Sequence, residues 1–285
     1  MKNLKFIPAL LLAVAFTFTA CEKDNEVSPS SNETEESGFT ARMTDSPADY
    51  DALTVQVLRV EAYNDQEGWI IINNETNYVS VLELTNGTET TIASDTDIEA
   101  GAYTKLKVVF GNDNHLTINA NAAADAGINS STANVQANAD GSFTLDLEWE
   151  GPQSIEVEID EEVSSESSAN VLIDFNVAQS IRQDAQTYII SPFMTEIKNE
   201  TTGVKGQVEG QLSAAILATN GQDTVSTYTD ANGQFLIRGL NGNEDYDIII
   251  MPTTDGVAEN AEEHTIESVL ITEGEIKTLN TINIL

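Results

Sequence analysis

Alternation of apolar and polar positions is the dominant pattern along this chain. In residues 105–110 an apolar side chain occupies every second position, which is typical of a half-buried β-strand. Residues 54–63 alternate in the same way, but the pattern slips by one position between Val57 and Leu58. A β-bulge, which adds one residue to a strand, would explain the slip. Because no long segment has the i, i+3, i+4, i+7 spacing of an amphipathic helix, the pattern predicts an all-β protein.

Two segments depart from this alternation. Residues 177–182 follow the apolar strand expected over 171–175, and they are the best candidate for a short helix. Residues 119–140 are rich in Ala, Asn, Ser and Gly, which predicts a long irregular loop. Strand signals then resume, and residues 188–197 predict a strand that closes this part of the chain.

The clearest local pattern predicts an amphipathic hairpin over residues 143–160, with one apolar and one acidic face. The acidic face consists of Asp146, Glu148, Glu150, Glu156, Glu158 and Asp160. Like charges opposite one another destabilise a sheet, so this face is a candidate site for Ca²⁺ or a basic partner. The alternative is a solvated surface that limits aggregation. The sequence has no D-x-[DN]-x-[DN]-G calcium loop, which favours that alternative.

Changes in composition suggest where domains begin and end. Residues 21–37 are an acidic, Ser- and Glu-rich stretch with almost no apolar residue, which predicts a flexible tether. A polar break at 198–203 separates two strand-rich segments. We therefore expect one β domain over 38–198 and a second over 203–285.

The N-terminus has the features of an export signal. Lys2 and Lys5 precede an apolar run over 6–20 that is too short to span a bilayer, which needs about 20 apolar residues. The run ends directly before Cys21, the only cysteine. Residues 18–21 resemble the lipobox of bacterial lipoproteins, which implies cleavage after residue 20 and lipid attachment at Cys21. The acidic residues that follow are similar to a surface-export signal of some Gram-negative bacteria, and the alternative is ordinary linker charge.

Composition and charge exclude several function classes. Lys plus Arg total 12 and Asp plus Glu total 47, so the formal net charge is −35, or 10 − 47 = −37 after loss of Lys2 and Lys5. A binder of nucleic acid needs the opposite sign, so we expect no nucleic-acid partner. One cysteine permits neither an internal disulfide nor a cysteine-rich zinc site. We expect attachment to the outer membrane through the lipid, with the domains exposed at the cell surface.

Five short motifs in order over 38–198 resemble a bacterial lipoprotein family, domain of unknown function 4382. They are RMTDSP at 42–47, YDALTV at 50–55, LELTNG at 82–87, IEAGAY at 98–103 and VLIDFNVAQSI at 171–181. The resemblance implies no known activity. Residues 44–47 have turn chemistry, with a proline that fixes φ, so we interpret Asp45 as structural rather than catalytic.

Residues 203–285 resemble the carboxypeptidase regulatory-like domain, a small transthyretin-like β-sandwich. The matching segments are GVKGQV at 203–208, TYTDANGQF at 227–235 and YDI at 246–248. The resemblance implies a fold that is also associated with carbohydrate binding, and such domains often act as spacers. The whole chain is therefore expected to contain two antiparallel β-sandwich domains in tandem.

Little in the sequence points to catalysis. His115 and His264 are the only histidines and neither accompanies a G-x-S-x-G elbow, so we expect no enzyme and no cofactor. Aromatic side chains that could contact a glycan are Trp69, Tyr63 and Tyr78, although Trp69 begins an apolar strand and is expected in the core. Trp149 is expected in the core as well.

These observations favour a non-catalytic binding role at the cell envelope. Carbohydrate is the first candidate ligand. The alternative is a structural or assembly module that presents a partner protein of the envelope at the outer membrane.

Overall fold

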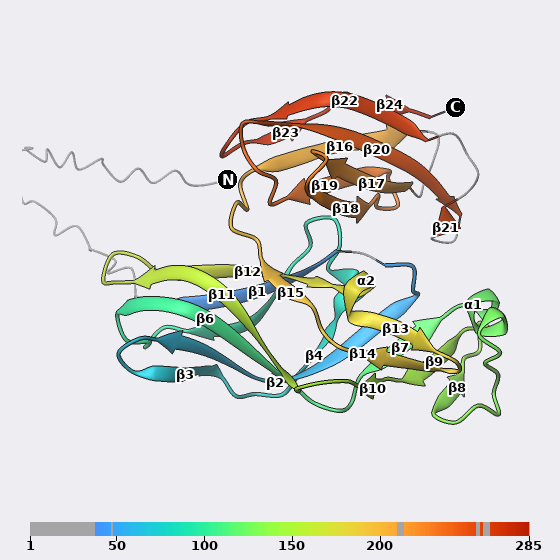
Figure 1. Ribbon diagram of the computed structural model, residues 1–285, viewed down its shortest axis with the longest axis horizontal. Helices are drawn as coiled ribbons and strands as arrows, with labels where there is room; N and C mark the ends of the chain where they lie inside the picture. The colour runs from blue at the N-terminus through green and yellow to red at the C-terminus, as the bar shows by residue number, and fades with distance from the viewer. Residues whose placement is uncertain (1–37, 47, 210–213, 255–256, 259–262, 285) are drawn as a thin grey trace, which may run out of the picture. The chain divides into compact units, whose positions relative to one another are not determined.

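The computed structural model describes residues 38–46, 48–209, 214–254, 257–258 and 263–284. The signal peptide, Cys21 and the tether predicted over 1–37 lie outside the described residues. The described chain is built almost entirely of β-strands (Figure 1). The all-β prediction is therefore confirmed.

The largest sheet of residues 38–198 is organised around the long strand β2, with the order β11-β6-β2-β7-β9-β8; β3 and β4 also pair with β2. Its strands are β2 (Ala52–Asn64), β3 (Gly68–Asn73), β4 (Asn77–Ser80), β6 (Gly101–Phe110), β7 (His115–Ile118), β8 (Val135–Ala137), β9 (Phe143–Asp146) and β11 (Ser154–Val163). All pairs in this sheet are antiparallel. We call it the β2 sheet.

Two smaller sheets complete this region. One has the order β15-β12-β1-β5, with β1 (Phe39–Ser46), β5 (Thr90–Asp95), β12 (Ala169–Asn176) and β15 (Met194–Glu196). The other has the order β10-β14-β13, with β10 (Glu148–Trp149), β13 (Ile181–Asp184) and β14 (Thr187–Ile190). The β1–β12 and β10–β14 pairs are parallel, unlike most other pairs.

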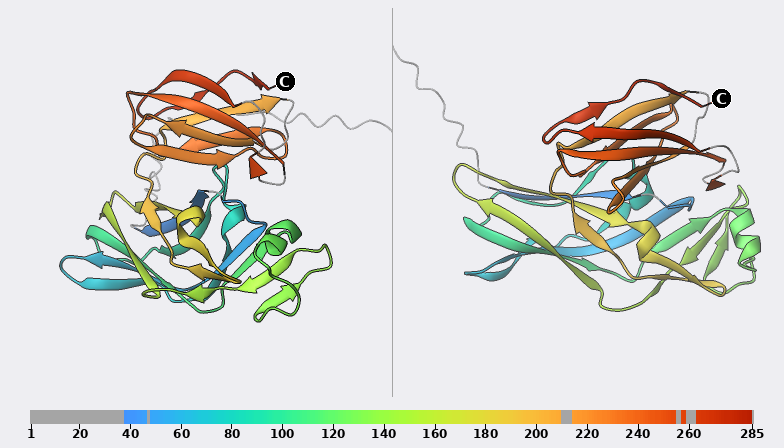
Figure 2. Two further views of the ribbon diagram at one scale, coloured as in Figure 1. Left: turned by 45° about the vertical axis from the view of Figure 1, so that its right-hand side comes forward. Right: turned by 45° about the horizontal axis from the view of Figure 1, so that its top comes forward.

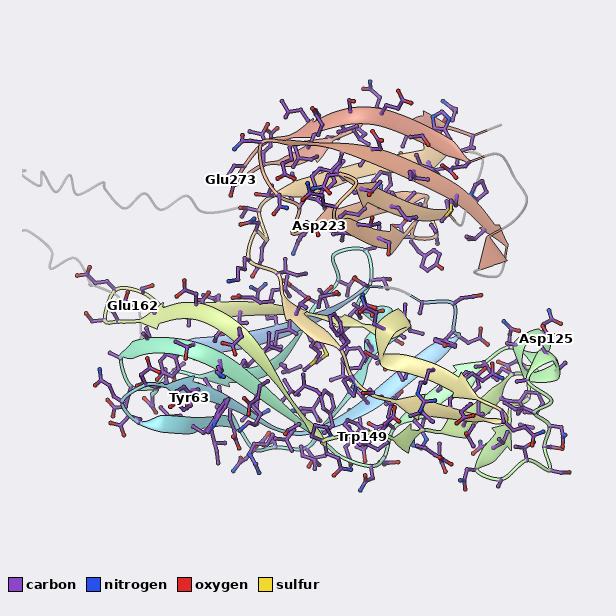
Figure 3. All side chains as sticks on the ribbon, viewed as in Figure 1. Tyr63, Asp125, Trp149, Glu162, Asp223 and Glu273 are labelled. Atoms are coloured by element: carbon purple, nitrogen blue, oxygen red, sulfur yellow. The ribbon has the colours of Figure 1, made fainter. Side chains whose placement is uncertain are left out.

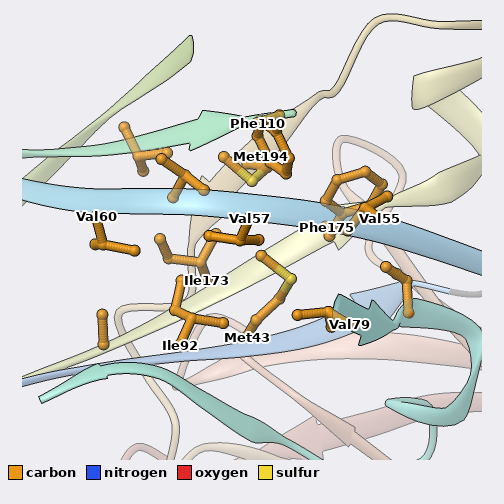
Figure 4. Close-up of a cluster of buried hydrophobic side chains, with 14 of the residues drawn as sticks. Met43, Val55, Val57, Val60, Val79, Ile92, Phe110, Ile173, Phe175 and Met194 are labelled. Atoms are coloured by element: carbon orange, nitrogen blue, oxygen red, sulfur yellow. The ribbon is translucent and has the colours of Figure 1, made fainter. Parts of the chain in front are cut away.

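The hydrophobic core of residues 39–194 lies between the β2 sheet and the sheet of β1 and β12. Met43 on β1 and Ile173 on β12 are fully buried, as are Val57 and Val60 on β2 (Figure 4). Along β1 the fully buried apolar side chains occupy alternate positions, which is the pattern of a strand that packs one face against another sheet. The core therefore fixes which face of β2 points to solvent.

Short helical segments connect the strands. They are η1 (Val81–Glu83), α1 (Ala120–Asp125) and α2 (Val177–Ser180). The helix predicted from residue 177 is confirmed over four residues, and the chain re-enters a strand at Ile181. The irregular loop predicted over 119–140 is wrong in part, because it contains α1 and β8. The run of alanines favours α1, and Asn119 Oδ1 caps it by accepting from Ala122 N at 2.9 Å.

The hairpin predicted over 143–160 is wrong. Residues 143–146 pair with β7 and β8, residues 148–149 pair with β14, and residues 154–163 pair with β6. The pairing with β6 places Glu156 opposite Lys107 and Glu158 opposite Lys105. A closed hairpin would instead have placed carboxylates opposite carboxylates, which destabilises a sheet.

The described residues within 203–284 form two further sheets (Figure 2). They have a hydrophobic core of their own, whose members range along the chain from Val204 to Ile282. In one sheet β16 pairs with β19, β23 and β24, and the other has the order β18-β17-β20-β21 with β22 on β20. The strands are β16 (Gly203–Glu209), β17 (Ala214–Thr219), β18 (Thr224–Tyr228), β19 (Gln234–Arg238), β20 (Glu244–Thr254), β21 (Val257–Ala258), β22 (His264–Ile271), β23 (Ile276–Thr278) and β24 (Ile282–Asn283). The core draws side chains from both sheets, as in a β-sandwich.

Candidate functional site

A β-bulge in β2 decides which side chains of this strand face solvent. The register of β2 against β6 shifts between Val57 and Arg59, as the slip in the sequence pattern predicted. Because of the extra residue, Val57 and Val60 both point into the core, although they are three positions apart. Without the bulge, Tyr63 would point inward and Ala62 outward, since a shift of one residue exchanges the two faces of a strand.

The β2–β3 turn brings two aromatic residues together. Asn64 Oδ1 accepts from Gln66 N at 2.8 Å, and Gly68 has a φ of +80°, a left-handed conformation that favours glycine. This turn places Tyr63 directly opposite Trp69. Their ring centroids are 5.2 Å apart and the ring planes meet at 64°, an edge-to-face contact.

Both aromatic residues lie on the outer side of the β2 sheet. Ala62, next to Tyr63, is fully buried, and alternate residues of a strand point to opposite faces. Tyr63 and Trp69 are partly exposed, and Tyr63 is labelled on this sheet in Figure 3. The expectation that Trp69 belongs to the core is therefore wrong. Trp149, in contrast, is partly buried and packs against the core, with its ring 5.7 Å from that of Phe110.

Lys107 on β6 joins the aromatic pair to a group of charges. Its Nζ lies 3.5 Å from the centroid of the Trp69 ring, a cation–π contact. The same atom lies 3.5 Å from Glu61 Oε2 and 3.4 Å from Glu156 Oε1. Because Glu61 is only 8% exposed, solvent screens these contacts less than at an open surface. The contacts hold Lys107 against the indole ring.

Two further cations complete this surface. Arg59 Nε donates to Glu61 Oε1 at 2.5 Å. Lys105 Nζ lies 3.1 Å from Glu158 Oε1, and this hydrogen-bonded contact raises the pKa of Lys105. We call the whole surface the aromatic face; its members are Arg59, Glu61, Tyr63, Trp69, Ile71, Lys105, Lys107, Glu156 and Glu158. It contains three cations and three carboxylates, in a chain whose net charge is −35.

A second polar group, the Tyr78 cluster, lies farther along β2. It consists of Gln56, Tyr78, Asp113, His115 and Asp146. Tyr78 donates to Asp113 Oδ2 at 2.7 Å and accepts from Gln56 Nε2 at 2.9 Å. The two ring nitrogens of His115 lie 2.8 Å from Asp113 Oδ1 and 3.0 Å from Asp146 Oδ1. The hydrogen bonds from Tyr78 and His115 lower the pKa of Asp113.

The six carboxylates proposed as an acidic face are dispersed. Asp146 binds His115, while Glu156 and Glu158 belong to the aromatic face. Glu150 pairs with Arg182 at 3.0 Å, and Glu148 and Asp160 are exposed. Within the part of the chain that the structure describes, no three His, Cys, Asp or Glu side chains are grouped as ligands for one metal ion.

Asp45 differs from the turn residue that the sequence suggested. It lies in strand β1, is 6% exposed, and its carboxylate oxygens make no hydrogen bond of ordinary geometry with the described residues, although the backbone amide of Val177 lies near. Burial raises its pKa to about 9, and the nearby Asp174 adds to this effect; the amide of Val177 offsets only part of it. Burial also raises the pKa of Asp174 to about 6. The hydrogen bond that Ser46 Oγ donates to Asp174 at 2.9 Å lowers this pKa and so offsets part of the rise.

Comparison with known families identifies the first part of the chain. Residues 36–192, more than half of the chain, match the family model described as domain of unknown function DUF4382. The chain belongs to the DUF4382 family. The motif-based resemblance is thereby confirmed for the first domain, whereas the carboxypeptidase regulatory-like resemblance of residues 203–285 stays a prediction.

Solved structures similar to this DUF4382 protein are distant. A variant of the shaft pilin SpaA from Lactobacillus rhamnosus GG has 8% identity and a TM-score of 0.22, over 87% of this chain and 98% of the pilin. Two Bacteroides ovatus structures described as candidate adhesins have 12% and 9% identity and TM-scores of 0.18 and 0.19. They cover 80% and 88% of this chain, and 75% and 88% of their own chains. The comparison with curated proteins gave no match.

The sequence missed several residues of this DUF4382 domain's aromatic face. The alternation pattern predicts Lys105 and Lys107 at the polar positions of a half-buried strand. It does not identify their partners on β11, because these are about 50 residues away in sequence. Arg59 and Glu61 are the outward residues beyond the bulge, so the slip in the pattern was the available signal. No helix in the described ranges is long and apolar enough to cross a bilayer.

Proposed function

We propose that this DUF4382 protein is a non-catalytic binding protein of the cell envelope and that its aromatic face binds carbohydrate. The observation that carries the proposal is the Tyr63–Trp69 pair, held on the solvent side of the β2 sheet beside Lys107. The two aromatic residues lie on paired strands, β2 and β3, and side chains on strands are held more precisely than side chains on loops.

The chemistry of the aromatic face suits a sugar. The apolar C–H groups of a pyranose ring can pack against exposed aromatic rings, while its hydroxyl groups need donors and acceptors at the edges. Lys105, Glu158 and Arg59 supply such groups around the two rings. A neutral saccharide carries no charge, so the chain's net charge of −35 does not repel it as it repels an anion.

The same proposal covers location and the remaining domain. The lipobox-like segment before Cys21 supports a lipid anchor in the outer membrane, and the acidic tether after it supports exposure of the domains at the cell surface. The carboxypeptidase regulatory-like resemblance of residues 203–285 supports a second β-sandwich that acts as a spacer.

A glycan-array screen of the full-length chain in detergent tests the proposal. It is run with calcium and again with a chelator, with Trp69→Ala as the test variant. Phe193→Ala is the matched control, because Phe193 is a 44% exposed aromatic residue that is not part of the aromatic face. We expect saccharide signals that Trp69→Ala abolishes and Phe193→Ala retains, unchanged by the chelator. A blank array with folded protein would refute carbohydrate binding and favour the alternative, presentation of a partner protein.

A further inference from the structure

The outer side of the β2 sheet continues beyond the aromatic face. Gln56 lies opposite Tyr78, and Thr54 lies opposite His115, which in turn lies opposite Asp146. Opposite residues of an antiparallel pair share a face, as do residues two apart on one strand. Since Val55 and Val57 are buried, Gln56 and the Tyr78 cluster lie on the outer side.

The bulge keeps this outer side continuous. Val60 and Ala62 are buried like Val55 and Val57, so Gln56, Arg59 and Tyr63 all project from the same side of β2. Tyr63 follows Gln56 by seven positions, one of which is the extra residue of the bulge, so the remaining six steps of about 3.3 Å span about 20 Å. The aromatic face and the Tyr78 cluster are thus the two ends of one strip.

Exposed apolar side chains concentrate on this strip. The large hydrophobic residues that are exposed in the described part of the chain are Leu58, Ile71, Tyr78, Phe193 and Leu270. Ile71 lies opposite Glu61 on the aromatic face, Leu58 stands at the bulge, and Tyr78 is 55% exposed at the far end. Single exposed apolar residues need no explanation, but three of them on one side of a sheet, on β2, β3 and β4, favour a binding surface.

The far end also offers preformed hydrogen bonding. Tyr78, Asp113 and His115 fix one another through hydrogen bonds of 2.7–2.8 Å. Beside them an open hollow of about 500 Å³ is lined by His115, Asp146, Gln136 and Thr144, among others. The exposed Tyr78 ring therefore lies next to hydrogen-bond donors and acceptors whose positions are fixed. The aromatic face, about 20 Å away, has the same combination of groups.

We infer that the strip along β2 binds an extended neutral oligosaccharide, with one end of the ligand on Tyr63 and Trp69 and the other on Tyr78. The inference rests on the proposed function and adds chain-length specificity to it: the ligand is an internal stretch of a polysaccharide rather than a single terminal sugar. An oligosaccharide gains contacts at both ends only when it is long enough to span them. Its affinity therefore rises steeply with length.

Calorimetric titration of the full-length chain tests this inference. The probes are linear gluco-, manno- and galacto-oligosaccharides, each as a disaccharide and as a hexasaccharide. We expect the hexasaccharide of at least one series to bind at least about tenfold more tightly than its disaccharide, as two-ended contact predicts. Tyr78→Ala should remove that gain, whereas Phe193→Ala should change neither the disaccharide nor the hexasaccharide affinity.

The possible results distinguish failure of the inference from failure of the proposed function. Equal affinity for disaccharide and hexasaccharide would overturn the two-ended strip and leave binding at the aromatic face intact. An unchanged length effect in folded Tyr78→Ala would overturn it as well. If no saccharide binds the folded chain, the proposed function fails first. The comparison of disaccharide and hexasaccharide affinities uses the unsubstituted protein alone. It therefore tests the inference even if Tyr78→Ala does not fold.

Discussion

Asp45→Asn is expected to stabilise this protein at neutral pH. Asp45 is almost fully buried, and neither of its carboxylate oxygens makes a hydrogen bond of ordinary geometry with the described residues. Burial therefore favours the neutral acid in the folded state, whereas the unfolded chain releases the proton at an ordinary pKa. Asparagine has nearly the shape of the neutral acid and has no proton to release.

The magnitude follows from the two pKa values. Burial raises the pKa of Asp45 from 3.8 to about 9. Because the folded-state value is the higher one, the stabilising contribution of the bound proton is complete below pH 4 and is lost as the pH rises towards 9. Between 3.8 and pH 7 the loss accumulates over about three pH units, which at about 1.4 kcal/mol each is about 4 kcal/mol. Asp45→Asn should recover up to that amount at pH 7.

Urea denaturation between pH 4 and pH 9 measures the effect. The free energy of unfolding of the unsubstituted chain is compared with those of Asp45→Asn and of Asp160→Asn, a control at an exposed position on β11. We expect the Asp45→Asn curve to diverge upwards from the unsubstituted curve as the pH rises, with the two nearly equal at pH 4. The Asp160→Asn curve should stay close to the unsubstituted one.

A constant loss of stability in Asp45→Asn across this pH range would show that Asp45 is not a neutral acid in the folded protein. That result would mean that Asp45 is ionised in the folded protein and that a donor or a cation holds its charge. Its removal would then leave the partner unpaired.

Three further predictions concern the anchor, the domain boundary and the core. Cys21→Ser should abolish acyl labelling and membrane association, and a variant that stays labelled and membrane-bound would contradict the anchor. Trypsin should cut after Lys198, whose side chain is 65% exposed, and release two stable fragments; no early cut near 198–203 would contradict the expected boundary. Trp149→Ala should lower the free energy of unfolding by about 3 kcal/mol, because the ring packs on Phe110; a loss below about 1 kcal/mol would show that this packing contributes little.

Local features of the fold could be predicted from the sequence. The bulge in β2 was encoded in the phase of its apolar residues, because Val57 and Val60 must both reach the core. The short helix from residue 177 follows directly on a strand, where the alternation stops. Both depend on the chemistry of neighbouring residues, which sequence patterns record.

Which strands pair with one another could not be predicted from the sequence pattern. Residues 143–160 have the alternation of two strands with a turn between them, and that pattern is the same whether the strands pair with each other or with different neighbours. The deciding contacts, of Glu156 and Glu158 with Lys107 and Lys105, join segments about 50 residues apart. Trp69 was misplaced for a related reason, since its direction depends on its register with Tyr63 on β2.

The sequence contained evidence that Asp45 is buried, but the turn motif at 44–47 pointed to a different interpretation. Phe39, Ala41 and Met43 are fully buried at alternate positions, and Asp45 is the next position in the same series. A strand that continued to residue 46 would place Asp45 on the core side, where a carboxylic acid is costly unless it is neutral or paired. The Thr-Asp-Ser-Pro order instead suggested that the strand had already ended.

Carbohydrate binding at the aromatic face depends above all on Trp69, and one titration measures that dependence. The hexasaccharide series is titrated into the full-length chain and into Trp69→Ala, Trp69→Phe and Phe193→Ala. We predict measurable binding that Trp69→Ala weakens at least about tenfold, that Trp69→Phe largely retains and that Phe193→Ala leaves unchanged. Binding of equal strength in Trp69→Ala, or no binding to the folded unsubstituted chain, would contradict carbohydrate binding at the aromatic face.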